Sequence, residues 1–510
     1  ASSSSSAGAP DGKHRHPLRD PLLEAKGGGE PEGRRATQQL QSRPAPPREG
    51  AAALGAESPL HGRPAPSSSP PARQSRKQKA EALSLRRLYR APRNATEWGG
   101  EYAERTAEWF ELFVDLIMVV SFSRMADFLV EDYTPGNVWL LLLFFSLFQS
   151  SWNLYTSYCT RFYDDSFLHT LYLVVFLLGM AGMTIHVGNS ELNLNFTVAM
   201  MVQRFSLLLM FFLTAHQNRR SKPHALIISY VILASLAILT IACFYSKNET
   251  VLHVLWLLVV VVELPYDIVA FFVLPQEKRL PINIDHSSDR GNALILAVLG
   301  ESVVSALQNY SGQRDIDRNS MFYLAMSLAL LLSFSIALLF YHVQPLTRDQ
   351  HAYRQSWKRG FFLYITLCCL APALLLVGVS IKFVTRATVL HHEMERDQVA
   401  LLFTSVGVSL ALIFMVRLSH YAGHHPSPDD AENVRVVKWA WWLLVGIWPV
   451  IVLSLLAVGD LQQAHPVSII AIVTALCFGL AFLETTITHW IDIQTQQEVV
   501  VSYGAVDPDE

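Results

Sequence analysis

A series of long apolar runs separated by short polar segments constrains this chain more than any other feature. The runs approach the length of about 20 residues that a helix needs to cross a bilayer. Because 51% of the 510 residues are hydrophobic and only 16% are charged, we expect an all-α polytopic membrane protein with about twelve transmembrane helices. The expected helices span residues 109–130, 137–158, 166–187, 194–216, 224–245, 250–273, 291–309, 320–341, 359–382, 398–418, 437–458 and 467–489.

The beginning of the chain has a different composition. Segments such as ASSSSSAGAP and RPAPSSSPPARQSRKQK are rich in Ser, Pro and Arg, and such segments bury too little apolar surface to become ordered. We therefore predict a disordered cytosolic tail over 1–97, a transmembrane domain over 108–490 and a cytosolic C-terminal tail over 491–510. Without the apolar core of a secretory signal, the first span is expected to act as the targeting signal. The basic stretch RQSRKQK could contact anionic membrane lipid.

The orientation follows from the distribution of Lys and Arg among the loops. Basic residues gather in QNRRSKPH, PQEKRLPINIDHSSDR, TRDQHAYRQSWKRG and the stretch ending NVRVVK. The loops that alternate with these hold few basic residues, and they are EDYTPG, GNSELN, YSKNET and GDLQQAHP. The first set of loops and both termini are therefore predicted to be cytosolic. Two outer loops reduce the contrast, because one holds Arg314 and Arg318 and the other holds Lys382, Arg386 and Arg396.

Glycosylation sequons agree with this orientation. Asn195, Asn248 and Asn309 all fall at predicted outward ends and are expected glycosylation sites, whereas Asn94 would be cytosolic and unmodified. The strings PLLE at 21–24 and YGAV at 503–506 resemble endosomal sorting signals. The plasma membrane and the endosomal or lysosomal membranes are both open as locations.

Several predicted spans carry polar residues that need a partner, a wet cavity or a function. Glu111 and Asp115 are four residues apart and so share one face of the first helix, near its cytosolic end. A polar stripe follows the cytosolic half of the second span, and it consists of Gln149, Asn153, Thr156 and Thr160.

The sixth span repeats the four-residue spacing with Glu263 and Asp267, on either side of Pro265. Membrane helices tolerate such a proline only against protein or water, because it frees a backbone carbonyl.

The seventh span places Glu301 near the bilayer midplane, with Arg290 and Ser305 close to the same face. The neighbouring Gly300 is predicted to allow close helix approach. Arg204, in the middle of the fourth span, is the expected partner of either Glu301 or Glu263.

Each buried group also has a purely structural interpretation. An Arg204–carboxylate pair could only hold helices together, and Glu111 could stabilise the start of its helix. The eighth to eleventh spans are almost purely apolar, which suggests one polar cavity beside a lipid-facing or oligomeric scaffold, so that a homo-oligomer is open. We find no convincing internal repeat, and so a transporter with two symmetric halves is not indicated.

The same stretches resemble the low-temperature requirement A (LtrA) family of multi-pass membrane proteins over residues 100 to 490. The opening signature W-x-E-L-F-x-D-L-x-x-V is matched by Trp109, Glu111, Leu112, Phe113, Asp115, Leu116 and Val119. A second signature, H-x-x-E-R followed by L-G-E-S, is matched by His286, Arg290, Leu299, Gly300, Glu301 and Ser302, with Asp289 in place of the usual glutamate. A weaker R-F-D-x-D element is similar to the stretch with Arg161, Phe162 and Asp165. The resemblance implies a membrane fold but no settled biochemical activity.

Our first functional hypothesis is a proton- or cation-coupled secondary transporter of a small solute. Buried carboxylates attract a positive ion, and burial helps them carry a proton near neutral pH. The coupling and vestibule residues would be Glu111, Asp115, Arg204, Glu263, Asp267 and Glu301. A gate would consist of His286, Asp289 and Arg290, and the polar cavity would include Gln149, Asn153 and Ser305.

The alternatives are a proton or cation channel and a non-catalytic scaffold. We expect no enzyme, because the sequence has no nucleophile elbow, phosphate loop or metal-ligand set. HYAGHH at 420–425 could sense pH or bind a metal, but it lacks further ligands at a defined spacing. No metal, cofactor or nucleic-acid partner is expected, and the predicted partners are membrane lipid and an unidentified solute or ion.

Overall fold

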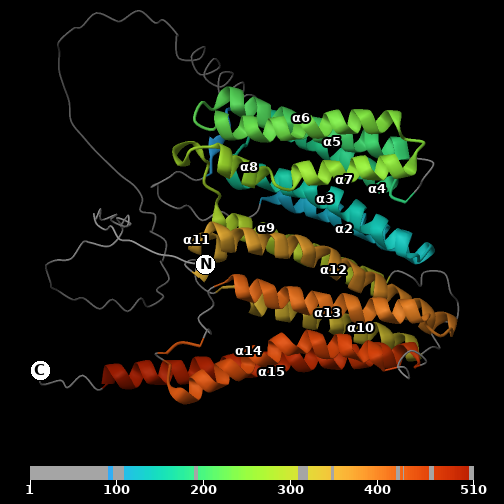
Figure 1. Ribbon diagram of the computed structural model, residues 1–510, viewed down its shortest axis with the longest axis vertical. Helices are drawn as coiled ribbons and strands as arrows, with labels where there is room; N and C mark the ends of the chain where they lie inside the picture. Colours follow the sequence, from blue (N-terminus) through green and yellow to red (C-terminus); the bar gives the residue numbers. More distant parts are fainter. Residues whose placement is uncertain are drawn as a thin grey trace, which may run out of the picture. The chain divides into compact units, whose positions relative to one another are not determined.

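The structure is a computed structural model of the 510-residue chain. It describes residues 90–95, 108–188, 193–307, 320–345, 350–420, 426–428, 430–458 and 464–504. The chain divides into two units, Ala1–Pro70 and Pro71–Glu510, and all described elements belong to the second unit. It is almost wholly helical, which confirms the predicted fold class (Figure 1).

The helices follow the predicted apolar runs closely. They are α2 (Trp109–Glu131), α3 (Pro135–Arg161), α4 (Phe167–Ile185), α5 (Asn193–Gln217), α6 (Lys222–Phe244), α7 (Glu249–Glu263), α8 (Tyr266–Val273), α9 (Ile284–Leu307), α10 (Ser320–His342), α11 (Ala352–Gln355), α12 (Trp357–Leu390), α13 (Arg396–Ser419), α14 (Glu432–Ser454) and α15 (Pro466–Gly504). Short 3-10 helices cover Gln276–Lys278 and Leu455–Ala457, and the strands are β1 (Arg93–Asn94) and β2 (Phe162–Tyr163). The chain is therefore a multi-pass membrane protein.

Within the described residues, ten helices are long and apolar enough to cross a membrane. An eleventh span results if α7 and α8, which meet at a bend of 42°, are taken together. The helix α2 is not among them, since Asp115, Arg124 and Asp127 interrupt its apolar surface. The number of twelve spans and the cytosolic position of both termini stay predictions.

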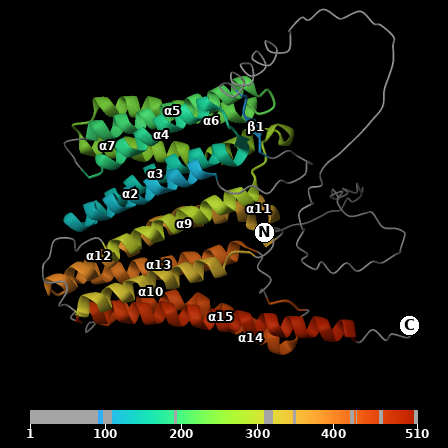
Figure 2. The same cartoon turned by 180° about the vertical axis from the view of Figure 1, so that it is seen from behind.

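The helices form two halves with the same packing plan, which the sequence did not indicate. The first half contains α2 to α8, and the second contains α9 to α15, as both views show (Figures 1 and 2). Counting the α7–α8 pair as one and leaving out the short α11, each half has six helices. In both halves the first helix packs against the second and the third, and each helix from the third to the fifth packs against the next helix in the chain. The second helix also packs against the fourth and the sixth.

The two halves meet along their first helices. The contacts between the halves run from α2 and α3 to α9 and α12. Since α2 and α9 each begin a half, the repeated plan places the two LtrA-like signatures side by side at this interface.

A short segment before the first span is ordered against the helical domain. Arg93 and Asn94 pair in antiparallel register with Tyr163 and Phe162, and the Asn94 Oδ1 accepts a hydrogen bond of 2.6 Å from Ser221 Oγ. Residues 90–95 fall inside the predicted disordered tail over 1–97. Residues 1–89 lie outside the described part of the chain. At the other end, α15 continues to Gly504, beyond the predicted boundary at 490.

Candidate functional site

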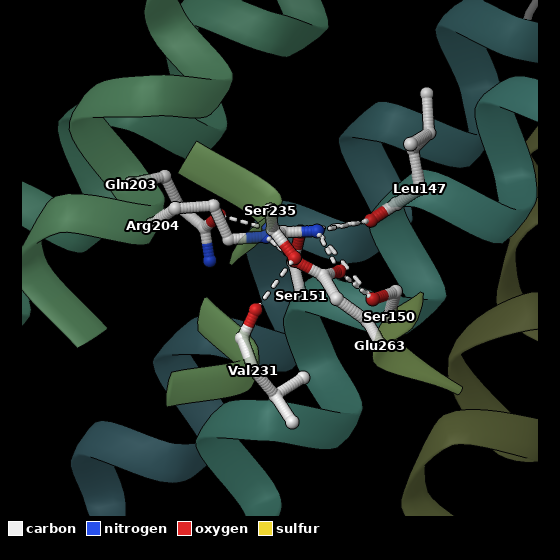
Figure 3. A network of polar contacts seen from close by, with 8 residues as sticks. All are labelled: Leu147, Ser150, Ser151, Gln203, Arg204, Val231, Ser235 and Glu263. Atoms are coloured by element: carbon white, nitrogen blue, oxygen red, sulfur yellow. Dashed lines mark hydrogen bonds and ion pairs between the residues drawn. The ribbon is translucent and has the colours of Figure 1, made fainter. Parts of the chain in front are cut away.

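A buried ion pair in the first half, here called the core pair, joins Arg204 on α5 to Glu263 on α7. The Arg204 Nε lies 2.6 Å from Glu263 Oε1, and Nη2 lies 2.7 Å from Oε2. Ser150 also donates to Glu263, and Arg204 Nη1 contacts Ser151 and Gln203 (Figure 3). All three guanidinium nitrogens and both carboxylate oxygens therefore have partners. Of the two predicted partners of Arg204, the structure selects Glu263.

The second half contains an ion pair between the corresponding two helices. Arg417 on α13 contacts Glu484 on α15, and these are the fourth and sixth helices of their half, as α5 and α7 are of theirs. The Arg417 guanidinium also lies 4.3 Å from the ring centroid of Trp441. Both pairs join the same two helices of a half, and this repetition favours the structural interpretation of the core pair.

Residues predicted as vestibule and as gate form one group, here called the inner cluster (Glu111, Asp115, His286 and Arg290). Two hydrogen bonds of 2.5 and 2.7 Å run from Arg290 to Asp115, and Trp152 Nε1 donates to Asp115 at 2.8 Å. His286 Nε2 lies 3.0 Å from Glu111 Oε2. The cluster is buried at the interface between the two halves.

The third predicted gate residue, Asp289, lies apart from this group. Asp289 is exposed, although it belongs to the same signature as His286 and Arg290. The inner cluster therefore uses one face of the signature only.

The helices α2 and α9 run parallel with a constant register along this interface. Glu111 with His286, and Asp115 with Arg290, are both pairs separated by 175 positions. A second group lies farther along the same two helices at nearly the same offset.

The second group, here called the outer cluster, consists of Asp127 on α2, Glu301 on α9 and Lys382 on α12. The Lys382 Nζ lies 2.8 Å from Asp127 Oδ1 and 3.6 Å from Glu301 Oε1. Ser305 donates a hydrogen bond of 2.5 Å to Glu301 Oε1, whereas Glu301 Oε2 and Ser302 Oγ have no hydrogen-bond partner in the described part of the chain. One carboxylate oxygen in a buried site is thus left unsatisfied.

Three sequence predictions are corrected here. Lys382 is not in an outer loop but almost fully buried, because α12 extends unbroken over Trp357–Leu390; Arg386 lies in the same helix. Ser305, predicted to line the polar cavity, binds Glu301 instead.

Close helix approach occurs at Gly378 and not at Gly300. No atom lies within 4 Å of the place where a side chain on Gly300 would begin, whereas one on Gly378 of α12 would collide with the Glu301 carboxylate. The missing side chain of Gly378 therefore makes room for the outer cluster.

Apolar side chains separate the inner and outer clusters. Asp115 and Asp127 are twelve residues apart on α2, which is about 18 Å along a helix. Met118 and Phe122 lie between them and are fully buried, and Phe122 stacks on Phe145 of α3. An ion would have to cross this layer to pass from one cluster to the other.

A cavity of about 780 Å³ lies among α3, α8, α9 and α12. All four residues of the predicted polar stripe line it, among them Gln149 and Asn153. Asp267 lines it too and forms an ion pair of 2.6 Å with Arg161. The size is within the range of cavities that bind small organic molecules.

Two histidines from separate loops meet at the wall of this cavity. The rings of His351 and His420 lie 4.9 Å apart, and His420 Nδ1 accepts a hydrogen bond of 3.3 Å from the backbone of Ala352. Burial lowers the pKa of His420 to about 3 and that of His351 to about 4. Both rings are therefore neutral at physiological pH.

The remaining predicted residues fall at the edges of the fold. Asn195 is exposed near the start of α5, and Asn248 is exposed and caps α7 by accepting a hydrogen bond from Val251 N. Asn309 lies outside the described residues. No group of three or more potential metal-binding side chains occurs in the part of the chain that the structure describes.

Sequence reasoning missed the site roles of Lys382 and Arg161. It also missed the aromatic residues that line the cavity, among them Trp152 and Phe271. Lys382 was hidden because basic residues near the end of an apolar run are typical of loops. Arg161 matches the weak R-F-D-x-D element, which was the available signal for its importance.

Comparison with known proteins agrees with this description. The profile of the family described as "Bacterial low temperature requirement A protein (LtrA)" matches residues 106–481. No curated protein and no solved structure matches the chain. The matched region begins just before α2 and includes both clusters, the cavity and the core pair. The chain belongs to the LtrA family.

Proposed function

We propose that this protein is a proton-coupled secondary transporter of a small solute, with Glu301 as the proton-binding group. The outer cluster is the observation that carries the proposal. Glu301 is fully buried, one of its oxygens has no partner among the described residues, and it competes with Asp127 for a single lysine. A membrane carboxylate in such a place is costly unless it has a function.

The chemistry of the outer cluster suits a proton. A proton on Glu301 neutralises the carboxylate, supplies a donor at the unsatisfied Oε2, and leaves Lys382 paired with Asp127. When the proton leaves, two carboxylates share the single positive charge of Lys382. Both states keep the ammonium paired, so Glu301 can bind and release a proton without leaving Lys382 buried and unpaired.

The same geometry favours a proton over a metal cation. The Lys382 ammonium already lies between the two carboxylates, at the place where a metal ion would bind. A metal ion would have to displace it, which costs the attraction of both ion contacts.

The two-half plan supplies a way to alternate access. Transporters built from two similar halves move one half against the other around a central site. Here the solute cavity and both ionic clusters lie at or beside the interface of the halves, and the apolar layer containing Phe122 separates the clusters. Rocking at the interface would open one side while the other stays closed.

The proposal is tested by solid-supported-membrane electrophysiology on purified protein in proteoliposomes, with pH steps and a solute panel. Transient charge movement that disappears in Glu301→Gln but persists in Gly300→Ala is the expected result. A sustained current would indicate a channel. Silence from correctly folded wild-type protein would contradict transport and favour a scaffold.

A further inference from the structure

The cavity presents two opposite charges side by side. Arg161 is 4% exposed and donates to Asp267 at 2.6 Å and to Ser157 Oγ at 2.6 Å. Its Nε has no hydrogen-bond partner among the described residues. The Asp267 side chain is 38% exposed although it lies in a membrane domain. The arginine therefore keeps an unused donor, and the carboxylate keeps an accessible surface.

Interaction with the helix dipoles explains only in part why Arg161 and Asp267 occupy these positions. Arg161 ends α3 and Asp267 is in the first turn of α8, where each charge complements its helix dipole. This accounts for the pair itself. It does not account for the unpartnered Nε, nor for the opening of the pair into a cavity of about 780 Å³.

The break between α7 and α8 places the amino-terminal end of a helix at the same place. α8 begins after Pro265 without a side-chain cap. Leu264 and Tyr266, which flank this proline, both line the cavity. Half-helices in membrane transporters direct such amino-terminal ends toward anionic groups of the substrate. The first turn of α8 and Arg161 together suit a carboxylate.

Aromatic rings and hydroxyl groups surround the pair. Asn153 donates to the Tyr364 hydroxyl at 3.1 Å, and its backbone oxygen accepts from the Tyr266 hydroxyl at 3.4 Å. Trp152 and Phe271 also line the cavity. Aromatic faces attract an ammonium group, and their apolar surface accepts the body of a ligand.

From these features we propose that the cavity binds an α-amino acid with an apolar side chain. The ligand carboxylate contacts Arg161 and the first turn of α8, and its ammonium contacts Asp267 and the tyrosine rings. Because the zwitterion carries no net charge, it substitutes for the protein's own ion pair without burying an excess charge. The amino acid as transported solute rests on the proposed function, whereas its binding does not.

Binding is measured by isothermal titration on the full chain in a non-ionic detergent, which carries no zwitterionic head group. The probes are L-leucine, L-phenylalanine and L-tryptophan, together with 2-phenylethylamine and 3-phenylpropionate, which each lack one charge of phenylalanine. We expect at least one amino acid to bind, and the best of them to bind at least about tenfold more tightly than either analogue, since one lost charged contact costs at least that much.

Variants locate the site. Arg161→Gln and Asp267→Asn should each weaken binding of the best amino acid at least about tenfold, whereas Asp430→Asn, which removes an ion pair with Lys438 outside the cavity, should leave binding unchanged. If a cavity variant fails to fold, the comparison of ligands on wild-type protein still decides.

Two results overturn the proposal. One is a single-charge analogue that binds as tightly as the amino acids, and the other is folded wild-type protein that binds none of them. Either result removes the amino acid as the solute. If the protein still shows charge movement on a pH step, the proposed proton coupling is not affected.

Discussion

The interior of each half and the interface between the halves use charged residues in different ways. Inside the first half, Arg204 and Glu263 satisfy each other completely with the help of neighbouring hydroxyls. At the interface, Glu301 shares Lys382 with Asp127 and keeps an unsatisfied oxygen. The complete pairing of Arg204 and Glu263 suits a role in holding the first half together, whereas the incomplete pairing of Glu301 supports the proposed proton binding there.

The two interior pairs are themselves unequal. Every guanidinium nitrogen of Arg204 has a partner, whereas Nη1 of Arg417 has none among the described residues and its guanidinium packs on Trp441. The second half thus holds the same two helices together with fewer hydrogen bonds and more aromatic contact.

The largest expected effect comes from breaking the core pair. Glu263→Gln leaves the Arg204 charge buried without its counter-charge, and we expect the free energy of unfolding to fall by about 3–5 kcal/mol. The double variant Arg204→Met/Glu263→Met should recover most of that loss, because no charge remains buried. Thermal and denaturant unfolding in detergent measures both. A double variant as unstable as the single one would mean that the pair does more than hold helices together.

A smaller effect is expected in the second half. Glu484→Gln leaves Arg417 its contact with Trp441, so the loss should be about 2 kcal/mol, below that of Glu263→Gln. The same unfolding measurement ranks the two variants. Equal losses would show that the aromatic contact does not compensate for the missing carboxylate.

Overpacking at the interface should have a comparable or smaller effect. In Gly378→Ala the new methyl group collides with Glu301, and we expect a loss of about 1–3 kcal/mol in stability together with reduced charge movement on a pH step. Gly300→Ala is the matched control and should change neither property. If both alanine variants behave alike, the close packing at Gly378 is not what shapes the outer cluster.

The smallest predicted effect concerns pH. Since the pKa of His420 is about 3 in the folded protein and about 6.5 when exposed, its contribution to stability is complete above pH 6.5 and is lost as the pH falls. Between pH 7 and 5.5 the wild type should lose about 1 kcal/mol more than His420→Gln. Unfolding curves at both pH values give the comparison. Equal pH dependence would show that His420 is not held neutral.

Much of the fold could be predicted from the sequence, because apolar runs of membrane length leave few alternatives to helices. The carboxylates at 111, 115, 263, 267 and 301 were found for the same reason, since a charge in an apolar run is conspicuous. The partner of each was harder, because it lies on a distant helix. Arg204 had two acceptable partners at similar depth, and only packing decides between them.

The repeated plan and the outer cluster could not be predicted. Helix packing can repeat while the side chains differ, so the similarity of the halves left no convincing repeat in the sequence. Lys382 lies at the end of an apolar run, where a lysine commonly marks a loop. Only the continuation of α12 to Leu390 places it beside Glu301.

The most direct test is charge movement on a pH step in proteoliposomes, compared between an interior and an interface variant. The account predicts that Arg204→Met/Glu263→Met, which empties the core pair, keeps the transient of the wild type, and that Glu301→Gln, equally well folded, abolishes it. The opposite result, with the transient lost from the double variant and kept by Glu301→Gln, would contradict the assignment of proton coupling to the interface between the halves.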